Sequence, residues 1–241
     1  MAIPQQIKRQ HDMDVNQRNE NGFYYDLLPL GGKFKTVLLD EIGAGWMFQF
    51  AHTKKLTDKD APFKIDVLEV HLIKTNERIP IGYFSCKIFK RKSTHYIANE
   101  DFMCECDGIS NSLYDFAYAL TVTCQHIEID DYFQQGSFAE LTLFELRPPY
   151  CGHGLGVQIA KLFFNLLKQK CKVHSIFIQP FPLQYENAKP MQALYDADAK
   201  AQLKAHQAAF KKDLAKLTNW YKKKLNATVI SKTSTRLEVN L

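Results

Sequence analysis

Three glycines within five residues mark the segment of this chain that is best suited to bind an anion. Residues 151–156 read Cys-Gly-His-Gly-Leu-Gly, where an apolar stretch ends and a helical pattern begins. Glycine adopts positive φ angles and leaves room for a ligand beside the backbone. The first amides of a helix have no internal acceptor and carry the positive end of its dipole. We therefore expect an anion to bind at this turn.

The residues on either side indicate which elements hold this turn. Residues 137–146 are apolar, β-prone and roughly alternating, and two prolines after Arg147 end the pattern. Apolar residues recur at helical spacing over 159–167, and residues 173–179 have the composition of a buried strand. The order strand, turn, helix, strand predicts a parallel strand pair joined by a right-handed crossover.

Two common glycine-rich phosphate sites do not fit the spacing. A Walker loop has Lys-Ser or Lys-Thr directly after its last glycine, whereas Val157 and Gln158 follow here. A dinucleotide-binding turn has the spacing Gly-x-Gly-x-x-Gly and an acidic residue at the end of the next strand. Here the glycines are spaced Gly-x-Gly-x-Gly, and the next strand ends in Gln179 and Pro180.

A third pattern, Arg/Gln-x-x-Gly-x-Gly/Ala, fits the turn better. It binds the pyrophosphate of coenzyme A in the GNAT (N-acetyltransferase) superfamily, which this chain resembles at Cys151-x-x-Gly154-x-Gly156. The chain departs from the pattern at Cys151, where the family has arginine or glutamine. Backbone amides could still bind the pyrophosphate, although a side-chain contribution at that position would be lost.

The resemblance continues on both sides of the turn. Residues 138–140, Phe-Ala-Glu, resemble the segment that carries the general base in the histone acetyltransferases of the family, and 146–150 resemble its Val-x-Pro-x-Tyr. Residues 79–84 resemble the second strand of the family's hairpin, which here would face residues 67–73. Residues 217–226 resemble its Leu-x-x-Phe-Tyr-x-x-Leu-Gly-Phe, with one additional residue after the tyrosine.

This resemblance implies a fold and a reaction. The fold is a mixed, mostly antiparallel α/β sheet with a parallel, splayed strand pair and flanking helices. The reaction is acetyl transfer from acetyl-CoA to an amine by direct attack in a ternary complex, without a metal. Glu140 would be the base and Tyr221 would donate a proton to the departing thiolate. Acetyl-CoA would contact Leu146, Cys151, Gly152, His153, Gly154, Leu155 and Gly156.

Each of these assignments has a competing interpretation. Glu140 could instead be an ordinary surface residue on the polar side of an alternating strand. Glu145 is the rival carboxylate, and its spacing of five residues predicts that it points to the opposite face. Tyr221 could instead be a core aromatic beside Trp220. Cys151 could be a nucleophile, because helix N-termini lower thiol pKa values, but no paired histidine or asparagine motif supports this.

The length and composition of the chain suit one globular domain with additions. It has 241 residues, of which 46% are hydrophobic and 12% aromatic. Residues 1–20 are polar and charged, which predicts a flexible arm. We expect a single GNAT-like domain over 21–241, with a helical insertion at about 186–216 that either covers the acceptor site or makes a homodimer contact.

The sequence also limits the compartment and the partners. It has no apolar run of membrane-spanning length and no signal-peptide core, so we expect a cytoplasmic protein without a membrane partner. Six cysteines without Cys-x-x-Cys spacing do not indicate structural zinc. A net charge of +5 does not indicate nucleic acid. The alternative function is a catalytically degenerate GNAT-like binding module that uses its lysine-rich helix to bind a protein or nucleic acid.

Overall fold

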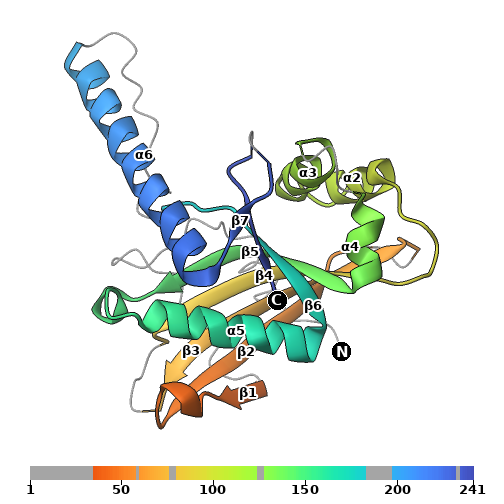
Figure 1. The fold of residues 1–241 in the computed structure, drawn as a ribbon, viewed down its shortest axis with the longest axis horizontal. Helices are drawn as coiled ribbons and strands as arrows, with labels where there is room; N and C mark the ends of the chain where they lie inside the picture. Colours follow the sequence, from red (N-terminus) through yellow and green to blue (C-terminus); the bar gives the residue numbers. More distant parts are fainter. Residues whose placement is uncertain (1–34, 58–59, 76–79, 124–127, 183–196, 232–233) are drawn as a thin grey trace, which may run out of the picture.

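A single twisted sheet organises the part of the chain that the structure describes. The computed structural model describes residues 35–57, 60–75, 80–123, 128–182, 197–231 and 234–241. Its strands lie in the order β1-β2-β3-β4-β5-β6-β8-β7, and every neighbouring pair is antiparallel except the parallel pair β5 and β6 (Figure 1). The strands are β1 (Lys35–Leu38), β2 (Trp46–Lys55), β3 (Phe63–Lys74), β4 (Gly82–Arg91), β5 (Ser137–Leu146), β6 (Val173–Ile178), β7 (Thr228–Val229) and β8 (Leu237–Asn240). The helices are α2 (Asn99–Asp107), α3 (Asn111–Tyr118), α4 (Ile129–Gln135), α5 (Leu155–Cys171) and α6 (Ala197–Leu225), with short η2 (Asp40–Ile42), η3 (Ala119–Thr123) and η4 (Pro148–Tyr150).

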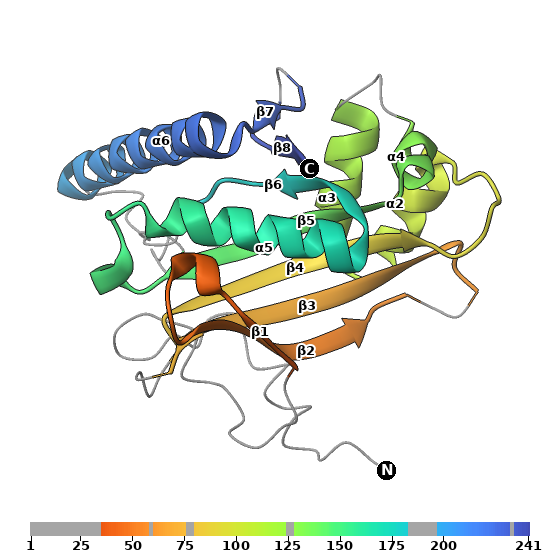
Figure 2. The same ribbon diagram turned by 60° about the horizontal axis from the view of Figure 1, so that its bottom comes forward.

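The helix α5 lies across one face of the sheet and forms the larger core with it (Figure 2). Its apolar side chains recur every three or four residues, so they share one helical face. Phe163 packs at 5.2 Å from Phe84 of β4 and 5.9 Å from Phe48 of β2, measured between ring centroids. The helix that connects β5 to β6 therefore also packs on β2 and β4.

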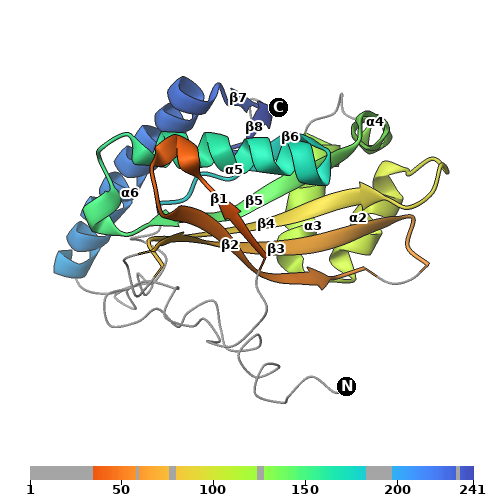
Figure 3. The ribbon, with the colours of Figure 1, turned by 90° about the horizontal axis from the view of Figure 1, so that it is seen from below.

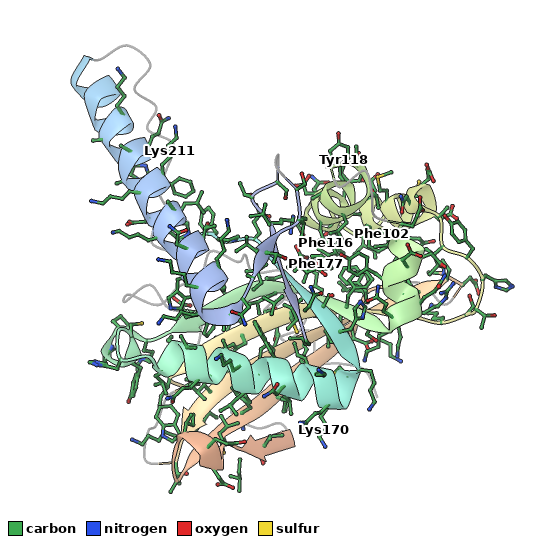
Figure 4. All side chains as sticks on the ribbon, viewed as in Figure 1. Phe102, Phe116, Tyr118, Lys170, Phe177 and Lys211 are labelled. Atoms are coloured by element: carbon green, nitrogen blue, oxygen red, sulfur yellow. The ribbon has the colours of Figure 1, made fainter. Side chains whose placement is uncertain are left out.

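A second core lies on the other face, toward one end of the sheet. There α2, α3 and α4 pack against the aromatic side chains of β4, β5 and β6, with Phe102, Phe116 and Phe177 at its centre (Figure 4). Phe89 and Phe138 stack at 4.9 Å across the strand pair β4 and β5. The Ser110 hydroxyl caps α3 by accepting from the Leu113 amide.

The predicted fold class is confirmed. The strand predicted over 137–146 is β5, the one over 173–179 is β6, and the two form the expected parallel pair across α5. The hairpin expected from residues 67–73 and 79–84 is β3–β4, and β7 pairs with β8 in a second antiparallel pair. The predicted arm at 1–20 and the start of the predicted insertion, 186–196, lie outside the described residues.

The C-terminal end of α6 packs beside α5, and its N-terminal part projects away from the sheet (Figures 1 and 3). Exposed lysines line this helix, including Lys211 (Figure 4). Within the described ranges, no helix combines the length and the apolar character needed to cross a membrane. Division into one domain with an inserted helix stays a prediction.

Candidate functional site

A β-bulge near the end of β5 changes the direction in which its side chains point. Ser85 of β4 pairs with Leu143, but the next residue, Cys86, pairs with Leu141, so Thr142 is an additional residue in β5. The Thr142 hydroxyl donates to the Ser85 carbonyl at 3.0 Å. The bulge lies where β5 leaves its parallel neighbour.

The parallel pair separates beyond the bulge. β5 and β6 are paired from Ser137 and Val173 as far as Leu141 and Ile178, where β6 ends. β5 continues for five more residues to Leu146, and those after Thr142 pair with β4 on their other side. In the described part of the chain, the β6 side of this segment therefore keeps backbone groups that no sheet ladder uses.

The glycine turn lies at the end of this separated segment. Gly152 has φ of 86° and Gly154, the N-cap of α5, has φ of 77°, which glycine adopts without strain. No atom lies within 4 Å of a Cβ placed on either residue. A Cβ on Gly156 would instead lie 3.4 Å from Leu146 and 3.8 Å from Trp220. The first two glycines keep the turn open, and the third allows α5 to approach β5.

The remaining predicted cofactor residues surround this turn. Cys151 and His153 are exposed, Leu155 is half-buried as the first residue of α5, and Leu146 packs against the larger core. Burial, followed by the negative charge of Glu145, raises the pKa of Cys151. A raised pKa keeps the Cys151 thiol protonated, which does not favour the nucleophile interpretation.

Glu140 lies at the position where the parallel pair begins to separate, and both of its carboxylate oxygens are ion-paired. Oε1 accepts from Arg236 at 2.8 Å and Oε2 accepts from Lys87 at 3.3 Å. The Glu140 and Arg236 side chains are 8% and 7% exposed. Arg236 also lies over the Phe116 ring at 5.2 Å, and Lys87 donates to Ser112 of α3. Glu140 is thus a buried ion-pair partner, not a surface residue.

Tyr221 is buried in the larger core, one turn before the end of α6. Burial raises the pKa of its hydroxyl, so the phenol is neutral at physiological pH. Its neighbour Trp220 lies 6.3 Å from Phe144 on the separated segment of β5 and beside Gly156. The C-terminal part of α6 therefore meets both the separated segment and the start of α5.

The sequence-based placement of Glu145 is wrong, and the bulge is the reason. Because Thr142 is an additional residue, Phe144 and Leu146 point toward α5, as Ala139 and Leu141 do. Glu145 therefore lies on the same face as Glu140. Glu145 is buried, with 7% exposure, and its partner residue in the neighbouring strand β4 is Tyr83.

Sequence reasoning missed the residues that fix Glu140 and those that surround the separated segment. Arg236 and Lys87 carry no motif, and Arg236 lies 96 residues from Glu140 in the chain. In the described segments, no three His, Cys, Asp or Glu side chains are grouped so that they could hold a metal ion.

His71 of β3 is a buried titratable side chain on the same sheet face as Glu145. Burial lowers its pKa from 6.5 to about 4. Between about pH 6.5 and 4, the unfolded chain binds a proton at His71 that the folded protein does not. We predict that the free energy of unfolding decreases by about 3 kcal/mol over this range because of this residue.

Denaturant titrations at several pH values measure this contribution. His71→Gln is expected to flatten the pH dependence between pH 6.5 and 4. A His71→Gln variant with the pH dependence of the wild type would contradict the assignment.

Comparison with known proteins gives similarities to solved structures. No protein-family model matches the sequence, and no curated protein matches it. The chain is similar to a mosquito arylalkylamine N-acetyltransferase like 5b, with 13% sequence identity and a TM-score of 0.33. The match covers 52% of this chain and 57% of that chain. The description of the fold therefore rests on the strand order, the parallel pair and the bulge.

Proposed function

We propose that this protein is an acyl-CoA-dependent N-acyltransferase that moves an acetyl group from acetyl-CoA to an amine. The observation that supports this most is the separation of β5 from β6 immediately before an open glycine turn. The pyrophosphate would bind the amides at the start of α5. The pantetheine amides would pair with the unused backbone groups of β5 near Leu146, which directs the thioester toward the bulge.

The proposed chemistry needs few special groups, because proximity in one site supplies much of the rate. A base takes one proton from the ammonium group, and the nitrogen lone pair then attacks the thioester carbon. The C–N bond forms, the C–S bond breaks, and the thiolate takes up a proton. An ammonium and acetyl-CoA thus give an acetamide, free CoA thiol and one released proton. Tyr221 suits the role of hydrogen-bond donor to the departing thiolate, since burial keeps its phenol neutral.

Glu140 is the proposed base. Both of its carboxylate oxygens are ion-paired, so one of them must be released before it can accept a proton. Arg236 holds the carboxylate in place through Oε1, and Lys87 must leave Oε2 before that oxygen accepts a proton. Release of Lys87 is feasible because its side chain reaches solvent and also bonds Ser112.

Glu140→Gln is therefore expected to slow acetyl transfer about 100-fold, with little change in the affinity for CoA. Release of free CoA thiol in a screen of amine acceptors measures the rate. The melting temperature is measured in parallel, because the change also removes a charge between two cations. Transfer at the wild-type rate by a destabilised variant would limit Glu140 to a structural role.

The same ion pairs favour a second candidate function, a non-catalytic binding module. If Lys87 never leaves Glu140, the carboxylate only fixes the sheet, and the exposed lysines of α6 would be the working surface. Salt-dependent binding of a nucleic acid or an acidic protein, without turnover of acetyl-CoA, would favour this candidate.

A further inference from the structure

A hollow of about 380 Å³ lies at the C-terminal end of α5, where Lys170 is found (Figure 4). The glycine turn is at the other end of this helix, and 17 helical residues separate the two by about 25 Å. We call this site the basic hollow, because its lining includes Lys64, Lys90, Arg91, Lys170, Lys172 and Ser137. Arg91 is already paired with Asp130 at 2.7 Å, so the charge of the hollow depends on the four lysines.

The sheet supplies one wall of the basic hollow. The ladder between β4 and β5 reaches Phe89 and Phe138, so Lys90 and Ser137 form the next row of residues. Lys64 of β3 pairs with Lys90 and continues this row. Because alternate residues of a strand share a face, the row lies on the face that α5 covers farther along the sheet. Two ammonium groups and one hydroxyl are therefore placed next to the end of α5.

Ser137 is a largely buried polar side chain that lacks a protein partner. The residue is 9% exposed, and in the described part of the chain its hydroxyl makes no hydrogen bond. Its amide donates to the Lys172 carbonyl at 3.2 Å, which joins the start of β5 to the end of α5. Since a polar group this buried normally has a hydrogen-bond partner, the hydroxyl indicates that a ligand or water occupies the hollow.

The charge of the basic hollow selects an anion. Lys170 and Lys172 are exposed, and within the described residues neither forms an ion pair. Asp66 accepts from Lys90 at 3.0 Å and from Lys64 at 3.7 Å through the same oxygen. Four lysines and this one carboxylate leave a net charge of +3. The dipole of α5 places about half a negative charge at this end, which the two unpaired lysines exceed.

We propose that the basic hollow binds a phosphate group, either as inorganic phosphate or as part of a small phosphate monoester. Lys170 and Lys172 supply the uncompensated positive charge, and Ser137 donates a hydrogen bond to a phosphate oxygen. Ammonium and hydroxyl donors suit an anion with several acceptor oxygens. The volume lies within the range of small-ligand sites, so the remainder of a monoester fits beside its phosphate. This site is separate from the glycine turn and does not depend on acetyl transfer.

Isothermal titration at constant ionic strength tests the proposal. Inorganic phosphate and glucose 6-phosphate are titrated at about pH 7.5, where phosphate is mostly a dianion, and glucose serves as the uncharged analogue. The titrations use the wild type and Gly154→Glu, because the substitution prevents the glycine turn from contributing an anion site. In both proteins we expect the phosphates to bind saturably and glucose to bind at least about tenfold more weakly. The wild type keeps the test valid if Gly154→Glu does not fold.

Substitutions in the hollow locate the bound anion. Lys170→Gln combined with Lys172→Asn is expected to weaken phosphate binding about tenfold or more. Asparagine is chosen because Lys172 has φ of 58°, a conformation that asparagine tolerates. Ser137→Ala is expected to weaken binding about threefold or more. Lys161→Gln combined with Lys168→Gln removes the same charge from exposed positions of α5 outside the hollow, and is expected to bind phosphate within about twofold of its parent.

Three results would overturn the proposal. The first is no saturable binding of either phosphate at about 10 mM. The second is an equal loss of affinity in the two lysine pairs, which would indicate attraction to net charge alone. The third is phosphate binding by the wild type that disappears in a folded Gly154→Glu, which would place the anion at the glycine turn. A difference in affinity between inorganic phosphate and glucose 6-phosphate, with the expected loss in the Lys170 and Lys172 variant, supports the site and identifies which source it prefers.

Discussion

Replacing Arg236 with methionine is expected to lower the free energy of unfolding by about 3–5 kcal/mol, because it leaves the Glu140 carboxylate buried beside a single remaining cation. Arg236 precedes β8, Glu140 lies on β5, and β6 lies between those strands in the sheet. Their ion pair therefore joins the two parts of the sheet at the point where β5 and β6 begin to separate.

Equilibrium denaturation with urea measures this effect, and two controls define its origin. Lys216→Met breaks the exposed pair with Asp213 and is expected to cost less than about 1 kcal/mol. The double variant Arg236→Met with Glu140→Leu removes both buried charges and is expected to recover much of the lost stability. A loss of less than about 1 kcal/mol in Arg236→Met alone would show that this ion pair does not hold the sheet together.

Replacing Gly154 with glutamate is expected to weaken binding of CoA about 100-fold or more. The new carboxylate would lie in the open turn, where a like charge opposes the pyrophosphate by several kcal/mol. Gly154 has φ of 77°, so any side chain there adds backbone strain, although no atom lies within 4 Å of the added Cβ. The strain and the charge must therefore be separated.

Gly154→Asn separates them, because asparagine tolerates the left-handed conformation and carries no charge. We expect this control to bind CoA within about tenfold of the wild type and to melt near the temperature of the glutamate variant. Isothermal titration with CoA gives the affinities. If the glutamate and asparagine variants bind CoA equally well, the anion does not lie at this turn.

Local patterns in the sequence predicted the elements that position the site. Alternating apolar residues and the following prolines predicted β5, and helical spacing predicted α5. The parallel pair followed from the order of these elements, since a strand that returns through one helix runs parallel to the first. These features depend on residues that are close together in the sequence, so a single sequence is sufficient to predict them.

The contacts that decide the chemistry were not predictable in the same way. An additional residue at Thr142 does not interrupt the apolar pattern, yet it reverses the faces of all later residues in β5 and brings Glu145 beside Tyr83. The ion pair of Glu140 with Arg236 joins residues 96 positions apart, and neither has a local signal for the other. Burial of His71 likewise depends on the assembled sheet.

Titration of the wild-type protein with acetyl-CoA tests the central claim most directly. The proposed function predicts saturable binding of one acetyl-CoA per chain, and weaker binding in Gly154→Glu than in Gly154→Asn. It also predicts that free CoA competes for the same site, since the pyrophosphate and pantetheine provide the contacts. No detectable binding of acetyl-CoA or CoA at about 1 mM would contradict the account.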